Sequence, residues 1–134
     1  MKTPTKTPKQ PISTPTAPAA IGPYSQGVKA GDFIFFSGQI PLCPHSSKIV
    51  DGGIKEQTAQ VLKNIDALLK SQNLTSDSVV KATVFLTDLN DFSAVNELYA
   101  NYFSTNPPAR SCIQVCKLPM GSLVEIEIIA MHNS

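Results

Sequence analysis

The chain has 134 residues, of which 42% are hydrophobic and 16% are charged, and its formal net charge is +1. This length is typical of one domain. A charge so close to zero provides no long-range field, which argues against a partner selected mainly for its negative charge, such as a nucleic acid.

Cysteine and histidine are too few and too scattered to indicate a disulfide framework or a metal site. The three cysteines, Cys43, Cys112 and Cys116, are an odd number without a Cys-x-x-Cys pair, and the two histidines lack ligand spacing. We therefore expect free thiols, no metal and no cofactor, in a reducing compartment: the cytoplasm, with the mitochondrion as the alternative. No apolar run approaches the ~20 residues of a membrane span, so no membrane partner is expected.

Residues 1–17 form a Lys/Thr/Pro-rich segment in which Lys-Thr-Pro occurs at 2–4 and again at 6–8. Five prolines among the first 18 residues prevent a helix, and nothing in the first 16 residues is expected to pack. The sequence therefore predicts a disordered tail over 1–17 and one folded domain over 18–134.

Hydrophobic periodicity and turn residues predict two helices and five strands in the order β-β-α-β-α-β-β. The first two strands are joined by a Gly31-Asp32 hairpin turn. The predicted elements are strands over 24–30 and 33–37, a helix over 54–71, a strand over 79–87, a helix over 91–104, and strands over 111–116 and 123–131.

This order of elements predicts an α+β fold. Helices separated by single strands imply right-handed crossovers and one mixed sheet with both helices on one face. The open face of that sheet also carries apolar positions. In so short a chain with so few surface charges, we expect another copy of the chain to cover it.

The run Pro-Pro-Ala-Arg before an apolar strand places a cation at the start of that strand. Pro107 and Pro108 restrict the backbone, and Arg110 then shares one strand face with Cys112 and Gln114. A guanidinium held in this way can bind a planar carboxylate or phosphate through two parallel hydrogen bonds. The alternative is a surface arginine in an ordinary ion pair.

Two carboxylates, Glu125 and Glu127, share one face of the last strand with apolar neighbours. Carboxylates in such surroundings are costly unless they are paired or used. Because a short turn joins this strand to the one that carries Arg110, we expect the two strands to be neighbours and one carboxylate to lie near Arg110. It would then stay ionised and could orient or deprotonate a water. The alternative is a pair of carboxylates that reach solvent or a lysine.

Other polar residues have an ordinary structural explanation beside a functional one. Ser37, before Gly38, supplies a hydroxyl at a strand end but is also a usual turn residue. Tyr24 is typical of a packing aromatic, and Asn96 of a solvent-facing amide. Cys112 lies two residues from Arg110, yet no histidine is spaced as its base, so an inert packing thiol is favoured over a nucleophile. If position 112 has a role in a site, its backbone carbonyl is at least as good a candidate for that role as its sulfur.

Five segments, in the same order, resemble the Rid family, the reactive-intermediate deaminases, also called the YjgF family. They are Ala-Ile-Gly-Pro-Tyr-Ser-Gln (20–26), Phe-Ser-Gly-Gln-Ile-Pro (36–41), Thr-Val-Phe-Leu-Thr-Asp-Leu-Asn-Asp-Phe (83–92), Pro-Ala-Arg-Ser-Cys (108–112) and Val-Glu-Ile-Glu (124–127). The resemblance implies a chorismate-mutase-like α+β subunit, a homotrimer and ligand clefts between subunits. It also implies hydrolysis of imines, formed from enamines such as 2-aminoacrylate and 2-aminocrotonate, to 2-keto acids and ammonia, without a metal.

The resemblance also assigns roles to residues. It implies that Arg110 binds the substrate carboxylate, that Glu125 positions the attacking water, and that the backbone at Cys112 accepts a hydrogen bond from the imine nitrogen. It implies further contacts in the cleft from Tyr24, Ser37 and Asn96. The stretch between Phe103 and Pro107 is short for the archetypal deaminases, which bears on the range of substrates.

Two other functions remain open from the sequence. One is an RNA-acting translation inhibitor or endoribonuclease, an activity attributed to some members of the family. Such a protein should carry a basic stripe with stacking aromatics, whereas three of the lysines here lie in the predicted tail. The other is a non-catalytic module that binds small acids, which would need Arg110 just as the enzyme does.

Overall fold

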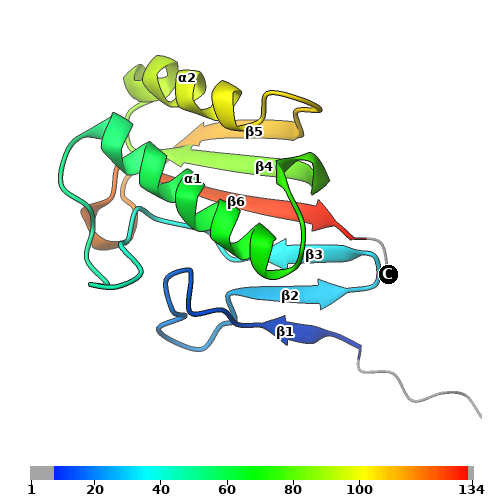
Figure 1. Cartoon of the computed structure of the whole chain (residues 1–134). Coiled ribbons are helices and arrows are strands. Elements are labelled where there is room, and N and C mark those ends of the chain that lie inside the picture. The colour runs from blue at the N-terminus through cyan, green and yellow to red at the C-terminus, as the bar shows by residue number, and fades with distance from the viewer. Residues whose placement is uncertain (1–7, 133–134) are drawn as a thin grey trace, which may run out of the picture.

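The structure is a computed structural model that describes residues 8–132. Six strands and two α-helices make up this part of the chain (Figure 1). They are β1 (Gln10–Ile12), β2 (Gly27–Ala30), β3 (Phe33–Phe36), α1 (Ile54–Ser71), β4 (Val79–Leu86), α2 (Phe92–Tyr102), β5 (Ala109–Gln114) and β6 (Val124–Met131).

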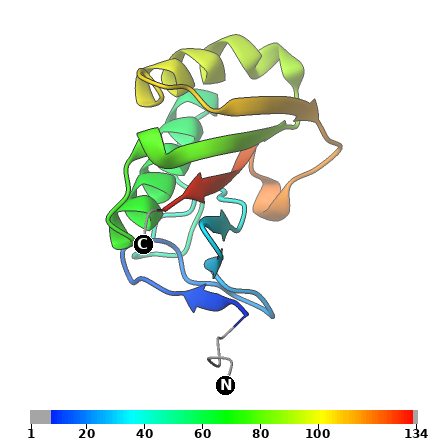
Figure 2. The same cartoon turned by 90° about the vertical axis from the view of Figure 1, so that its right-hand side faces the viewer.

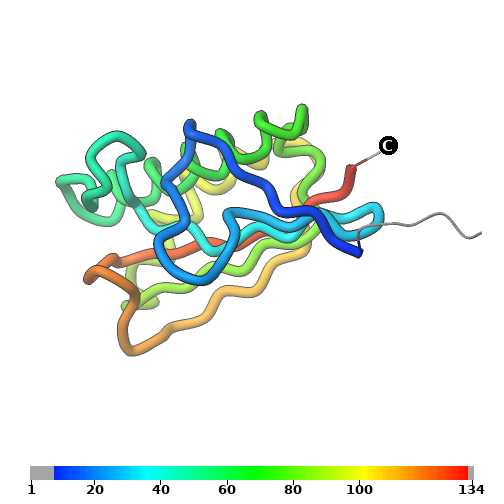
Figure 3. Tube along the Cα trace, turned by 90° about the horizontal axis from the view of Figure 1, so that it is seen from below, coloured from blue at the N-terminus to red at the C-terminus, as the bar shows by residue number. Residues whose placement is uncertain are grey.

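The strands form one mixed sheet in the order β1-β2-β3-β6-β4-β5. β4 and β5 are parallel, as a crossover through α2 requires, and the other pairs are antiparallel. Figure 3, which looks at the molecule from below, shows both helices on the same side of the sheet. The predicted α+β class, the single mixed sheet and the two helices on one face are confirmed.

The core lies between the two helices and one face of the sheet. Alternate residues of β4 and β6 point toward the helices because side chains along a strand alternate between the two faces. The apolar stripe of α1 meets them, and together they hold the most deeply buried side chains, among them Ile65, Leu68, Val84, Leu86, Ile126 and Ile128 at 0–2% exposure. The intervening residues of β6, including Glu125 and Glu127, therefore lie on the open face.

The prediction of a disordered tail over 1–17 is wrong for its second half, and residues 1–7 lie outside the described residues. β1 pairs with β2 at the edge of the sheet, where Figure 2 shows it at the end opposite β5. Proline is tolerated on an edge strand, so Pro11 does not prevent pairing. Ile12 and Ala17 are buried, and the Gln26 side chain accepts from the Thr14 N–H and donates to the Pro18 carbonyl.

We expect Ile12→Ala to destabilise the fold by roughly 2 kcal/mol or more, because Ile12 is 6% exposed and its truncation leaves a cavity under the sheet edge. Urea unfolding would show a lower midpoint. Ser13→Ala, at the exposed next position, should leave that midpoint unchanged. Equal midpoints for the two variants would mean that β1 does not pack in solution.

Candidate functional site

Arg110 lies on the helix side of β5, opposite Ala82 of β4. Its Nη1 donates to Asn96 Oδ1 at 2.8 Å, and its Cζ lies 5.3 Å from the ring centre of Phe92 and 4.7 Å from that of Tyr99. The one ion pair within the described residues joins Lys70 and Asp66, so no carboxylate there neutralises Arg110. It is also the only arginine in the chain. The ordinary ion pair is therefore not what holds this guanidinium, and most of its N–H groups are available to an anion.

Asn96 is not the solvent-facing amide that its position in the sequence indicates, because its carbonyl oxygen is bound by Arg110. The three contacts come from positions 92, 96 and 99 of α2, which share one face of a helix. Sequence reasoning did not include Phe92 or Tyr99 in the site. The i, i+4, i+7 spacing of positions 92, 96 and 99 places them on one helix face, but the same spacing is typical of residues that face the core.

Cys112 lies on the same strand face as Arg110 and packs against the core. Burial raises the pKa of its thiol, and the charge of Arg110 opposes that shift less strongly, which favours a protonated, unreactive sulfur. The Val115 N–H donates to the Leu86 carbonyl of β4 at 2.8 Å. Because backbone groups alternate in direction along a strand, the N–H and C=O of Cys112 point away from β4, toward the free edge of the sheet.

Tyr24, Ser37 and Glu125 line a cavity of about 370 Å³ at the open face of the sheet, opposite the face that carries Arg110. Tyr24 is 54% exposed, so it is not a packing aromatic within this chain. The Ser37 hydroxyl donates to the Ser25 carbonyl at 2.6 Å. The Glu125 carboxyl group lies directly against Gly38, where a Cβ would come within 2.9 Å of Glu125 Cδ and clash with Oε2. Only glycine allows this close approach.

The pKa of Glu125 is raised, first by burial and second by the negative charge of Glu127. The prediction that a neighbouring Arg110 keeps it ionised is therefore wrong for one copy of the chain. A carboxyl group whose pKa is raised toward neutrality is a better general base than an ordinary glutamate, because it binds a proton more firmly.

The strand order explains why Arg110 and Glu125 are separated. β5 and β6 were predicted to be neighbours because a short turn joins them, but β4 lies between them (Figure 1). β5 takes the outer side of β4 after the α2 crossover, and β6 inserts between β3 and β4. Arg110, Asn96 and Cys112 consequently gather on the helix side, whereas Tyr24, Ser37 and Glu125 gather on the open side.

The open face of the sheet is rich in exposed apolar side chains. Phe33, Phe35, Ile113 and Met131 are 41–48% exposed there. Large apolar residues exposed together on one face are typical of a contact with another protein surface. They match the expectation that another copy covers this face.

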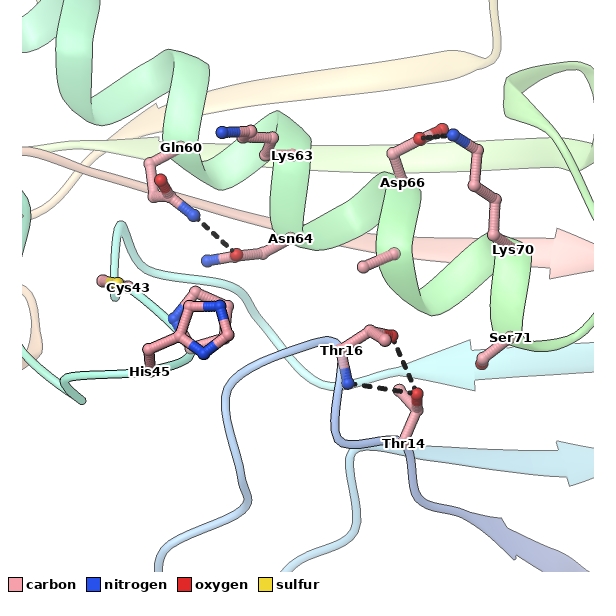
Figure 4. Close-up of a pocket in the computed structure, with 12 residues that line it drawn as sticks. Thr14, Thr16, Cys43, His45, Gln60, Lys63, Asn64, Asp66, Lys70 and Ser71 are labelled. Atoms are coloured by element: carbon pink, nitrogen blue, oxygen red, sulfur yellow. Dashed lines mark hydrogen bonds and ion pairs between the residues drawn. The ribbon is translucent and has the colours of Figure 1, made fainter.

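A larger cavity, of about 660 Å³, lies elsewhere, between α1 and the segments around Thr14 and Cys43 (Figure 4). Its polar groups bind one another: Asn64 accepts from Gln60 and donates to the Leu42 carbonyl, and Lys70 pairs with Asp66. None of the predicted site residues lines it. Within residues 8–132, no group of three or more His, Cys, Asp or Glu side chains could hold a metal ion. Neither helix of that region has the length and apolar character to cross a membrane.

Comparison with known proteins shows to which family the chain is similar. Residues 14–132 match the family model described as Endoribonuclease L-PSP. A 2-iminobutanoate/2-iminopropanoate deaminase of Mus musculus is 51% identical over 122 residues, which are 91% of this chain and 90% of that protein. A RutC family protein of Pyrococcus horikoshii is also 51% identical, over 91% of this chain and 97% of its own length. A crystal structure of a Rid family protein from Yersinia pestis superposes with a TM-score of 0.89 at 49% identity, covering 92% of this chain and 98% of the other.

The family model spans most of the chain, and each of these relatives exceeds 48% identity over more than nine-tenths of it. Similarity of this extent covers the helices, the sheet from β2 to β6 and both groups of candidate residues. The chain belongs to the Rid family, also called the YjgF family.

Proposed function

We propose that the protein hydrolyses reactive 2-imino acids, formed from enamines such as 2-aminoacrylate and 2-aminocrotonate, to 2-keto acids and ammonia. The observation that carries the proposal is the guanidinium of Arg110, held by Asn96 and by no carboxylate in the described part of the chain. Relatives about half identical, from Mus musculus and Homo sapiens, are named 2-iminobutanoate/2-iminopropanoate deaminase. A formal charge of +1 gives no support to an RNA substrate.

The proposed reaction adds water across a C=N bond. Arg110 binds the substrate carboxylate through two parallel hydrogen bonds, and the Cys112 carbonyl at the free edge of β5 accepts from the imine N–H. Glu125 takes a proton from a water as the water oxygen bonds to C2, and that proton is passed to the imine nitrogen as the C=N double bond becomes single. In the resulting carbinolamine the hydroxyl proton is then transferred to the amino nitrogen, the C–N bond breaks to release ammonia, and the keto C=O forms. Tyr24 and Ser37 line the cavity of the base.

The active cleft requires two copies of the chain. The two groups of residues lie on opposite faces of one sheet with β4 between Arg110 and Glu125, so no side-chain rotation can bring them together. The exposed apolar side chains of the open face provide a surface for association. β5, which carries Arg110, is the outer strand of the sheet, so Arg110 lies near a free edge that another copy can approach. We propose a homotrimer in which the helix-side group of one copy meets the open-face group of the next.

Mixing two inactive variants should restore activity if the cleft is shared. Arg110→Lys and Glu125→Gln chains, co-refolded in equal amounts, should recover about a quarter of the wild-type rate, because a random ring places an intact Arg110 next to an intact Glu125 at that frequency. The rate is measured as ammonia release. The same two preparations mixed without refolding are the control. Recovery no greater than in that control would overturn the cleft shared between two copies.

Gly38→Ala should lower kcat/KM by ~10²-fold while the fold persists, because the added Cβ displaces the Glu125 carboxyl group from its position. The matched control is Gly53→Ala, whose Cβ meets nothing nearer than Glu56 Oε1 at 4.0 Å. Steady-state kinetics and melting temperatures of both variants check this. A fully active Gly38→Ala would show that the close packing of Glu125 on Gly38 does not matter for catalysis.

The direct test of function couples the protein to a dehydratase that generates the enamine in situ. We expect the protein to accelerate the appearance of both 2-keto acid and ammonia. Calorimetric titration with 2-oxobutyrate, done in parallel, separates the two remaining functions. Binding of 2-oxobutyrate without any acceleration would favour a module that only binds small acids.

A further inference from the structure

The guanidinium of Arg110 lies between two aromatic rings of α2. Its Cζ is 5.3 Å from the centre of the Phe92 ring and 4.7 Å from the centre of the Tyr99 ring. Phe92 and Tyr99 are seven residues apart, which is two helical turns and about 10.5 Å along the axis. Because the two distances are nearly equal and the rings are two turns apart on one face, the guanidinium occupies the gap between them. Asn96 lies midway and binds Nη1.

This arrangement fixes the cation without neutralising it. An ion pair with a carboxylate would fix Arg110 equally well but would occupy its N–H groups and cancel its charge. Ring faces attract a guanidinium through their quadrupole and contact its flat face. They therefore leave the N–H groups, which point outward in the plane of the guanidinium, without a partner. The hydrogen-bonding edge that Asn96 does not use is therefore available to a second planar group.

We propose that Phe92 and Tyr99 are positioning residues, whose ring faces hold the Arg110 guanidinium in the orientation that receives the substrate carboxylate. The inference rests on the proposed function, because it assigns Arg110 to substrate binding. It adds two residues that act through Arg110 and do not contact the substrate. Their contribution is to affinity, since the carboxylate is bound in the ground state and in the transition state alike.

The contribution of Tyr99 lies in its ring and not in its hydroxyl. Tyr99 is 5% exposed, and its hydroxyl has no hydrogen-bond partner among the described residues. A hydroxyl without a partner donates no hydrogen bond that could hold Arg110. Tyr99→Leu and Phe92→Leu each remove one ring and so test the two ring faces separately.

We expect each leucine variant to raise KM, and the Kd for 2-oxobutyrate, by about fivefold with kcat nearly unchanged. A purely structural role would instead lower the melting temperature and kcat and leave the Kd of the folded fraction unchanged. Because Tyr99 is in the core and its leucine variant is prone to misfolding, Phe92→Leu, at a half-buried position, provides the independent second measurement. Unchanged KM and Kd in a folded Phe92→Leu would overturn the proposal.

The decisive experiment changes the ring without changing its volume much. Phenylalanine carrying one, two or three fluorines is incorporated at position 92, and the Kd for 2-oxobutyrate is titrated by calorimetry. Fluorine withdraws electron density from the ring face, so the Kd should rise in steps with the number of fluorines. The same series at Phe36, which is buried in β3 away from Arg110, is the matched control and should give a constant Kd.

The outcomes separate this inference from the proposed function. Stepwise loss of affinity at position 92 supports the role of the rings, even if the wild type proves to bind 2-oxobutyrate without turning over imines. A flat series in a protein that hydrolyses imines overturns the role of the rings and leaves the proposed function intact. A wild type that binds no 2-oxobutyrate overturns both.

Discussion

Arg110→Lys should reduce kcat/KM for imine hydrolysis by ~10²-fold or more while the fold remains intact. Lysine keeps the positive charge but replaces a planar fork of donors with a point charge, so the two parallel hydrogen bonds to a carboxylate are lost. It also cannot keep the geometry with Asn96 Oδ1, which Arg110 Nη1 contacts at 2.8 Å. The measurement is steady-state kinetics with the enamine generated in situ.

The sole arginine of the chain offers a second route to the same test. Arg110 is the only guanidinium that an arginine-directed reagent such as phenylglyoxal can modify, and 2-oxobutyrate should protect both the residue and the activity. Lys55→Ala, which removes an exposed cation of α1, is the control for a general loss of positive charge. Near-normal rates in Arg110→Lys, or inactivation that 2-oxobutyrate does not slow, would contradict the assignment of Arg110 to the carboxylate.

Local sequence patterns predicted the elements, since each pattern is set by residues close together in the chain. The period-two alternation of β6 and the stripe of α1 both follow from which side chains must be buried, and the structure confirms them. The strand at Gln10–Ile12 escaped prediction because its composition resembles a disordered segment. Its order comes from pairing with β2 and from the contacts of Gln26 with Thr14 and Pro18, which sequence spacing does not reveal.

The sequence proposed candidate residues for the site but not how they are arranged. The alternation of β5 predicted that Arg110 and Cys112 share a strand face, but not that this face is the one covered by α2. The contact of Arg110 with Asn96 became visible only once α2 was packed on that strand. The position of Glu125 depends on β6 inserting between β3 and β4, which is a choice of topology and not of local pattern. A short connection favours adjacent strands only on average.

Glu125→Gln should slow imine hydrolysis by ~10²-fold or more while preserving the affinity for 2-oxobutyrate. The amide has the size and hydrogen-bonding capacity of the acid but is a poor base. The melting temperature should not fall. The pKa of Glu125 is raised in the fold, chiefly by burial, so its ionised form destabilises the protein at neutral pH and a neutral side chain removes that cost.

The pH dependence of the wild-type kcat also tests Glu125, because the role of the residue as a base fixes the direction of the change. Glu125 must be ionised to take a proton, so kcat should fall as the pH is lowered through its pKa, which lies above the ordinary value of 4.5. Glu127→Gln removes the second cause of that shift, and the acid limb should therefore move to lower pH without reaching the ordinary value, because burial remains. If the acid limb does not shift in Glu127→Gln and Glu125→Gln remains active, the water is activated by another group, and Glu125 serves only to shape the cavity beside Gly38.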